Sequence, residues 1–344
     1  MAMADDMVLE GAVHPAANRN LFGHEAAEAY LATAYSSGKG HHAILFEGGE
    51  GIGKATLAFR FANHVLHYPE PHSAPDHLIA PDHAAPLTRQ IIAGASHDLL
   101  HLERPVDVKT GKRRTAITVD EVRRAGHFLS QTSGTGNWRI VIVDAADDLN
   151  RSAANAILKI LEEPPRNAMF LLISHTPGRL LPTIRSRCLP FRLRPLAPED
   201  LLKALGALGV DSGGEDGARL AALANGSVSE ALKLVNYGGG EIIDAYQATL
   251  EGSDAEARAM MHRLADTLAK RDNETVFDFL LGHIEEDIRS RAREAAEAGA
   301  IARAERLAAL SSEVGNDVAT ADAFNLDRKQ LVLDLLSRIR LAVK

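Results

Sequence analysis

Gly48, Gly53 and Lys54 have the residue types and spacing of a loop that binds phosphate. They form the pattern Gly-x-x-x-x-Gly-Lys within the stretch AILFEGGEGIGKATLAF. In such a loop successive backbone N–H groups surround the phosphate, and the lysine reaches the β- and γ-phosphates. The flanking stretches predict a strand, AILFE, and a helix, KATLAFRFANHVL, whose N-terminus also favours anions. The residues expected to form a weak or vestigial nucleotide site here are Gly48, Gly51, Gly53, Lys54, Ala55 and Thr56.

The loop lacks the hydroxyl group that would hold magnesium. Ala55 stands where a phosphate loop normally has serine or threonine, and Thr56 comes one residue later. One residue along a helix rotates a side chain by about 100°, so Thr56 does not simply replace the missing group. We therefore expect ATP to bind weakly at most, and magnesium to be doubtful.

The second half of a phosphate-loop site is an acidic residue at the end of a buried strand. The stretch RIVIVD supplies Asp144 for a magnesium ion or its waters. Ala145 follows, where a ring-forming ATPase would have the glutamate that polarises water. Asp147 and Asp148 are interpreted as caps of a helix that begins near Arg151. Losing both the magnesium hydroxyl and the base should cost several powers of ten in rate, since each such group contributes about 10²-fold or more.

The elements that must position these residues follow an α/β pattern up to about Pro195. Short apolar runs alternate with amphipathic stretches, which predicts a parallel sheet covered by helices. The expected strands lie in HAILFEGG, HDLLHLERP, WRIVIVDAA, AMFLLISH and LPFRLRPL. The expected helices run over 54–67, 119–132 and 151–163, with a short one near Pro182. The segment 68–94, rich in proline, alanine and histidine, is expected to be a long loop or insertion.

From Ala197 onward the pattern is purely helical. Three short helices are expected up to about Asn236, followed by longer ones with apolar faces formed by Phe277, Leu280, Leu281, Ile284 and Ile288, and by Val332, Leu335, Leu336 and Ile339. We therefore predict three domains: a phosphate-loop α/β domain at 1–195, a three-helix domain at 196–238 and a helical bundle at 239–344.

Composition limits the classes of function. There are 38 basic and 46 acidic residues and a net charge of −8, so the whole chain is not an electrostatic nucleic-acid binder. The single cysteine, Cys188, excludes an internal disulfide and a thiolate zinc site, and it is expected to pack rather than to react. Acidic residues near the start and the lack of long apolar runs favour a cytoplasmic protein without a membrane partner.

Scattered histidines do not form a convincing metal site. They lie at His64, His67, His72, His77, His83, His97 and His101. Their spacing matches no closed site with paired ligands, so we prefer a structural interpretation and expect no metal.

A longer stretch carries a specific family resemblance. Residues 155–188, NAILKILEEPPRNAMFLLISHTPGRLLPTIRSRC, closely resemble the hallmark region of the AAA+ subunits of bacterial sliding-clamp loaders. The stretch LFGHEAAEAYLATAYSSGKGHHAILFEGGEGIGKATLA and the helical third domain extend this resemblance over almost the whole chain. It implies a RecA-like AAA+ domain, a three-helix lid and a helical collar that assembles a ring.

The resemblance also implies roles for single residues. Arg187, within SRC, matches the arginine that reaches the γ-phosphate held by a neighbouring subunit, and Arg185 is the less favoured alternative. A guanidinium is always charged and offers several donors, which suits that role. Ser174 stands where the family places a polar sensor of the γ-phosphate. Ser229 replaces the second sensor, an arginine in active members. The four-cysteine zinc module of many relatives is missing, so no zinc is expected.

The implied task is to help an ATP-driven loader of the replicative DNA polymerase III place the sliding clamp on primed DNA. The implied partners are ATPase subunits of the gamma or tau type, a delta subunit, the clamp and DNA. Candidate DNA contacts are Lys112, Arg113, Arg114, Arg123 and Arg124, although a solvated helix face explains them more simply. One alternative is a hydrolysing gamma/tau-like motor subunit, and a more distant one is a small-molecule phosphate-loop kinase. Whether the chain is itself an enzyme stays open at this point.

Overall fold

The computed structural model describes residues 9–107, 111, 113–131, 137–211, 213–270, 273–324 and 326–343. The chain divides into two compact units, one up to Leu232 and one at Lys233–Lys344. The hydrophobic clusters of the first unit lie on the two faces of a sheet, and the second unit has a cluster of its own. The predicted boundaries at residues 195 and 238 stay predictions.

The first unit is built on a five-stranded parallel sheet. Its strands are β1 (Ala43–Glu47), β2 (Leu99–Leu102), β3 (Arg139–Asp144), β4 (Ala168–Ser174) and β5 (Leu189–Arg192), in the order β2-β3-β4-β1-β5. All five lie within the apolar runs that predicted them. Because every strand is parallel, the segments that follow the strands meet at one edge of the sheet, which we call the carboxyl edge.

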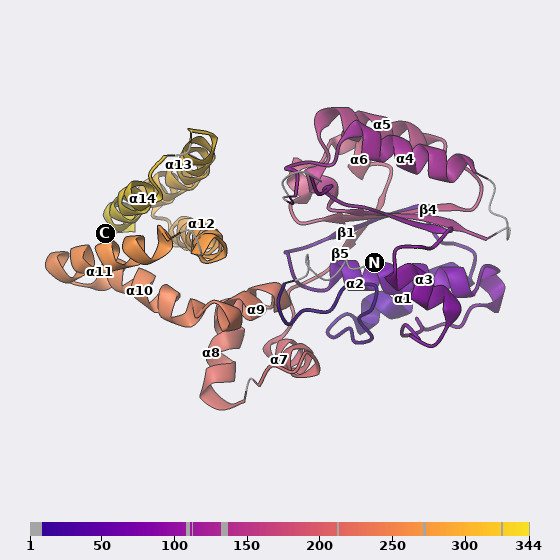
Figure 1. The fold of residues 1–344 in the computed structure, drawn as a ribbon, viewed down its shortest axis with the longest axis horizontal. Helices are drawn as coiled ribbons and strands as arrows, with labels where there is room; N and C mark the ends of the chain where they lie inside the picture. Colours follow the sequence, from indigo (N-terminus) through magenta and orange to yellow (C-terminus); the bar gives the residue numbers. More distant parts are fainter. Residues whose placement is uncertain are drawn as a thin grey trace. The chain divides into compact units, whose positions relative to one another are not determined.

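Helices cover both faces of this sheet (Figure 1). One face carries α1 (Glu25–Ser36), α2 (Lys54–His67) and α3 (Pro86–Ile92), and the other carries α4 (Val119–Ser130), α5 (Arg151–Glu162) and α6 (Pro182–Arg185). The alternation of side chains along β1 explains this arrangement, since Ile44 and Phe46 join one core and Ala43 and Leu45 the other. The predicted parallel sheet with helices covering it is thereby confirmed.

Two elements differ from the sequence-based expectation. The segment 68–94 is not a long loop, because it contains a 3-10 turn at Pro71–Ser73 as well as α3. Pro86 begins α3, Ile91 is buried, and the hydroxyl of Thr88 donates to Oδ1 of Asn63 on α2 over 3.0 Å. Helix α1, which was not predicted, packs on α2 through its buried face.

The three short helices predicted after the sheet are confirmed. They are α7 (Pro198–Ala207), α8 (Gly214–Ala224) and α9 (Val228–Asn236). Pro198 occupies the first turn of α7, where its missing N–H costs nothing. We call these three helices the lid.

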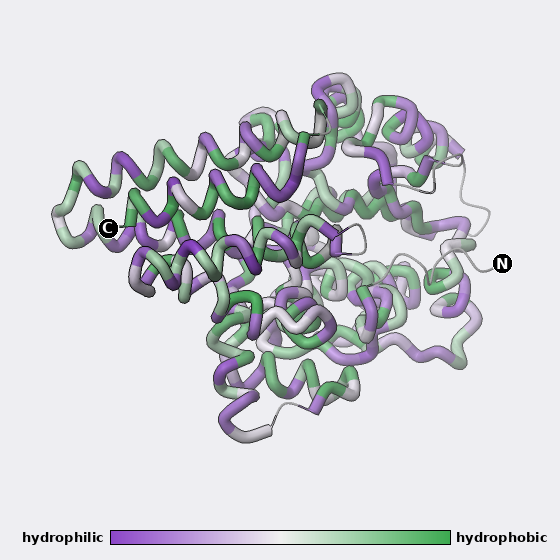
Figure 2. Tube along the Cα trace, turned by 60° about the vertical axis from the view of Figure 1, so that its left-hand side comes forward, coloured by the Kyte–Doolittle hydropathy of each residue, from purple (hydrophilic) through white to green (hydrophobic). Residues whose placement is uncertain are grey.

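The second unit consists of helices throughout its described residues. They are α10 (Gly239–Glu251), α11 (Asp254–Leu268), α12 (Glu274–Glu297), α13 (Ile301–Phe324) and α14 (Arg328–Val343). Both predicted apolar faces, on α12 and α14, are buried in one common core. Figure 2 shows green and purple segments alternating along the helices near the C-terminus, as expected for amphipathic helices.

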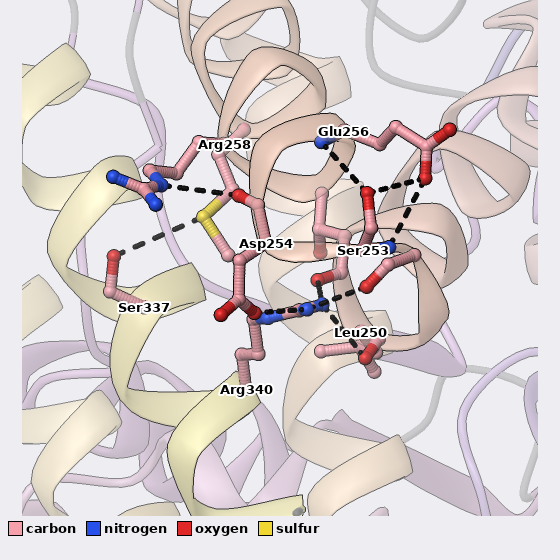
Figure 3. Close-up of polar contacts among 10 residues, drawn as sticks. Leu250, Ser253, Asp254, Glu256, Arg258, Ser337 and Arg340 are labelled. Atoms are coloured by element: carbon pink, nitrogen blue, oxygen red, sulfur yellow. Dashed lines mark hydrogen bonds and ion pairs between the residues drawn. The ribbon is translucent and has the colours of Figure 1, made fainter.

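Arg340 connects three elements of the second unit (Figure 3). Its guanidinium donates to the carbonyl oxygens of Thr249, Leu250 and Gly252 over 2.6, 2.9 and 2.6 Å, and to Oδ1 of Asp254 over 2.9 Å. The carbonyls at the C-terminus of α10 are therefore satisfied by α14. Ser253 and Glu256 form a capping box that begins α11.

Among the helices of the described ranges, none combines the length and the apolar character needed to cross a lipid bilayer.

Candidate functional site

A cavity of about 890 Å³ lies at the carboxyl edge of the first unit. The predicted residues that line it are Gly51, Gly53, Lys54, Ala55, Thr56 and Asp144. The N-terminal segment and the lid complete its wall, with apolar contributions from Leu21, Leu196 and Leu232. The size and the mixed lining suit a nucleotide-sized ligand.

Lys54 is turned back onto its own loop. Its ammonium group donates to the carbonyl oxygen of Gly48 over 2.8 Å and to that of Gly49, and the residue is 3% exposed. Burial lowers the pKa of Lys54 to about 8, although the nearby carboxylates, led by Asp144, act in the opposite direction. To reach a phosphate, Lys54 would have to exchange both carbonyl contacts for contacts to the ligand.

The lid contacts the phosphate loop at Gly51. The N–H of Val228 donates to the carbonyl oxygen of Gly51 over 2.9 Å. Gly51 has φ +74°, and a Cβ atom added there would lie 2.3 Å from Oγ of Ser227 and 2.6 Å from Cβ of Ser229. Nε2 of His24 lies 2.6 Å from the carbonyl oxygen of Ile52. Ser229 is therefore packed directly against the loop.

Asp144 ends β3 as predicted and faces the cavity. Oδ2 of Asp144 lies 3.8 Å from Nε2 of His101. Burial opposes ionisation of Asp144, but His101, with His175 and Lys54, outweighs it and holds the pKa of this carboxyl below its usual value. Sequence reasoning missed His101 and His175 as neighbours of Asp144. His101 lies within the run that predicted β2 and His175 ends the run that predicted β4, and these positions were the only available signal.

The prediction that Asp147 and Asp148 cap α5 was wrong. Asn150 is the cap, since its side chain accepts from the N–H of Ala153 over 2.8 Å. A 3-10 turn at Ala146–Asp148 directs Asp147 toward the end of β4 instead.

Asp147 and Asp148 have other partners. Asp147 accepts from the hydroxyl of Ser174 over 2.8 Å and from the N–H groups of the two residues that follow. Asp148 pairs with Arg104 at 3.2 Å. Ser174 is fully buried, and its hydroxyl is directed at Asp147.

The residues of this site fit a phosphate group better than they fit magnesium. Glycine N–H groups and Lys54 are present for phosphate, but Ala55 offers only a methyl group and Asp144 is already next to His101. A hard cation requires several oxygen ligands. The described side chains therefore do not fit a magnesium ion. Within the described residues, no group of three or more His, Cys, Asp or Glu side chains is arranged to hold a metal.

Arg187 lies at the opposite edge of the sheet from the phosphate loop. It precedes β5, whose first residue Leu189 is in register with Ile44 near the start of β1, whereas the loop follows Glu47 at the end of β1. Arg187 therefore lies near the start of β1 and the phosphate loop follows its end. The five residues of β1, at about 3.3 Å per residue, place the two roughly 16 Å apart along the strand direction. Arg187 and the loop of the same chain are therefore not brought together.

The Arg187 side chain is held by two contacts. Nη2 lies 2.6 Å from Oε1 of Glu162, and Nη1 donates to the carbonyl oxygen of Thr183 over 2.8 Å. The neighbouring Cys188 is 6% exposed, and burial raises the pKa of its thiol to about 12, consistent with a packing role.

The predicted DNA contacts that the structure describes all have acidic neighbours. Arg113 pairs with Glu103 at 3.1 Å, Arg114 with Asp107 at 3.5 Å, Arg123 with Asp120 at 2.9 Å and Arg124 with Glu121 at 2.5 Å. Lys112 lies outside the described residues. Their role in DNA binding stays a prediction.

Known proteins resemble part of this chain. The DNA polymerase III subunit delta′ of Pseudomonas aeruginosa is 38% identical over 148 residues, which are 43% of this chain and 41% of the relative. Subunit delta′ of Escherichia coli is 33% identical over 169 residues, 49% and 46% of the two chains. Subunit tau of Escherichia coli is 32% identical over 171 residues, 50% of this chain and 24% of the relative. The aligned stretch thus spans less than half of each of these relatives.

The family model described as DNA polymerase III, delta subunit, matches residues 23–197, which is half of the chain and includes the phosphate loop, Asp144 and Arg187. The chain therefore belongs to the DNA polymerase III delta-subunit family, among relatives named delta′.

Proposed function

We propose that this chain is a clamp-loader subunit whose own phosphate loop is degenerate and whose Arg187 serves ATP held by a neighbouring subunit. Its partners would be ATPase subunits of the gamma or tau type and a delta subunit. Together they would place the sliding clamp on primed DNA. The chain would then contribute to hydrolysis in a neighbour and carry out little of its own.

The observation that carries this proposal is the position of Arg187. It lies at the edge of the sheet opposite the loop, partly exposed, on a segment anchored by the buried Ile184 and Cys188. A phosphate that Arg187 contacts must therefore belong to another molecule. A guanidinium supplied from outside a site can neutralise the charge that develops on a transferring phosphoryl group.

A hydrolysing motor subunit is the second candidate, and the similarity to subunit tau favours it. Ala55 and Ala145 count against it, because they replace the magnesium hydroxyl and the base. The packing of Ser229 against Gly51 also counts against it. ATP turnover by the isolated chain, or by a loader whose other ATP sites are disabled, would support the motor and contradict our proposal.

The decisive test compares Arg187→Ala with the wild type in a loader reconstituted with gamma or tau subunits. We expect intact assembly and a fall of roughly tenfold or more in DNA- and clamp-stimulated hydrolysis at the site that Arg187 serves. Arg185→Ala is the matched control, because Arg185 is exposed two residues away, and it should leave turnover unchanged. Unchanged turnover in Arg187→Ala would remove the proposal.

A further inference from the structure

Glu162 is the acidic side chain that contacts Arg187. Oε1 of Glu162 lies 2.6 Å from Nη2 of Arg187, and the two side chains are 48% and 33% exposed. The second contact, from Nη1 to the carbonyl oxygen of Thr183, is 2.8 Å long. Because an arginine carries five N–H donors, these two contacts leave donors for a phosphate.

Both partners of the pair stand on rigid supports. Glu162 is the last residue of α5 and follows Leu161, which is 1% exposed and whose carbonyl oxygen lies 3.3 Å from Nε2 of His42. On the other side, Ile184 and Cys188 are buried around Arg187. Two exposed side chains fixed at their bases in this way meet with few alternative geometries.

Glu162 does not stabilise α5, the helix to which it belongs. A carboxylate in the last turn of a helix faces the negative end of the helix dipole, which is electrostatically unfavourable. Pro164 and Pro165 already end the helix. The ion pair with Arg187 is the interaction that compensates Glu162 at this place.

We propose that Glu162 is a positioning residue for Arg187. It holds the guanidinium in one orientation at the surface, so that less side-chain freedom is lost when a neighbour's phosphate arrives. This inference rests on the proposed function, because it has a catalytic consequence only where Arg187 serves a neighbouring ATP site. Glu162 itself does not contact the phosphate.

The test measures the part of stimulated ATP hydrolysis that depends on Arg187, defined as the difference between wild type and Arg187→Ala in the reconstituted loader. In Glu162→Ala this part should fall roughly two- to fivefold, the factor that corresponds to the strength of an exposed ion pair. The fall should occur in kcat with KM for ATP unchanged, because the neighbour's loop binds the nucleotide. Glu162→Gln keeps an acceptor and should retain an intermediate rate.

Two controls separate this inference from the proposed function and from a folding defect. Glu163→Ala changes the adjacent exposed carboxylate and should leave turnover at the wild-type level. The double variant Glu162→Ala/Arg187→Ala should hydrolyse ATP at the rate of Arg187→Ala alone.

Several outcomes would contradict the positioning role. If Arg187→Ala lowers turnover but Glu162→Ala behaves like Glu163→Ala, the positioning role of Glu162 is wrong, whereas the proposed role of Arg187 at a neighbour's ATP site is retained. If Arg187→Ala has no effect, the proposed function fails first. If Glu162→Ala does not assemble, Glu162→Gln decides, and wild-type turnover in that variant overturns the inference.

Discussion

Lys54 and Ala55 are adjacent residues with opposite consequences for nucleotide binding. The ammonium group of Lys54 can bind a phosphate, but only by giving up its hydrogen bonds to the carbonyl oxygens of Gly48 and Gly49. Ala55 removes the ligand through which magnesium would add to that binding. At the scale of single residues, the site can recognise a phosphate but is poorly equipped to recognise a magnesium–nucleotide complex.

We therefore expect weak nucleotide binding that does not require magnesium. Titration calorimetry with ATP, with and without magnesium, should give similar dissociation constants in the high micromolar range or weaker. These correspond to a binding free energy no more favourable than roughly −5 kcal/mol. Lys54→Ala should abolish any binding that is seen. Tight binding that depends strictly on magnesium would contradict this interpretation of Ala55.

Gly51 is the residue at which the loop and the lid meet, and its substitution should be unusually costly. Gly51→Ala combines a positive φ with a Cβ only 2.3 Å from Oγ of Ser227, so we expect a loss of more than about 2 kcal/mol of unfolding free energy. Gly94→Ala is the matched control, because φ is +63° there and no atom lies within 4 Å of the added Cβ. It should cost only about 1 kcal/mol. Equal losses in denaturant titrations would show that the lid contact is unimportant.

At the scale of elements, the strands were predicted well because buried parallel strands are nearly continuous apolar runs. Helices α2 and α5 were also predicted almost to the residue, since a phosphate loop starts one and two prolines end the other. Helix α3 was missed because its seven residues lie among prolines and histidines, and contacts with α2 stabilise it. The partners of Asp147 could not be predicted, because they depend on how β4 ends beside β3.

Arg340 is the residue through which α14 stabilises α10 and α11. Arg340→Met keeps the apolar stem but leaves three buried or partly buried carbonyl groups without their donor, so we expect a loss of roughly 2–4 kcal/mol. Arg258→Met is the control, because Arg258 is exposed and contacts the same residue, Asp254, through a 3.1 Å bond to its carbonyl oxygen (Figure 3). That variant should stay within about 0.5 kcal/mol of wild type in thermal or denaturant unfolding.

At the scale of the whole molecule, the sequence predicted where α/β segments give way to helical segments along the chain. It did not predict which residues distant in sequence lie close together or far apart in space. The change from α/β to all-helical signals near Pro195 corresponds to the end of the sheet and the start of α7. The opposite placement of Arg187 and the phosphate loop follows only from the register of β5 with β1. The ion pair with Glu162 likewise requires knowing where α5 ends relative to β5.

Acid should destabilise the protein through buried histidine. His64 is fully buried, neither ring nitrogen has a hydrogen-bond partner among the described residues, and burial lowers its pKa to about 4. The unfolded chain, with a histidine pKa near 6.5, binds the proton more readily. The contribution of neutral His64 to the free energy of unfolding is therefore fully present above about pH 6.5. It is lost as the pH decreases toward 4, which lowers the free energy of unfolding by up to about 3 kcal/mol.

Denaturant titrations at pH 7.5 and pH 5 check this expectation. His64→Phe should reduce the difference in unfolding free energy between the two pH values, because an uncharged ring cannot bind the proton. Exposed His97 is the control, and His97→Phe should leave the difference unchanged. A pH dependence that is identical in His64→Phe and in wild type would assign the acid sensitivity to other groups.

Strand β5 has a consequence for how another protein can approach this molecule. It is an outer strand of the sheet, only four residues long, and Pro190 within it has no N–H to offer. The side chain of Arg192 is 80% exposed at its end. A short edge strand that contains proline resists pairing with a strand of another chain, which protects against aggregation. Any partner that docks beside Arg187 must therefore recognise side chains, and so its fit depends on shape and charge.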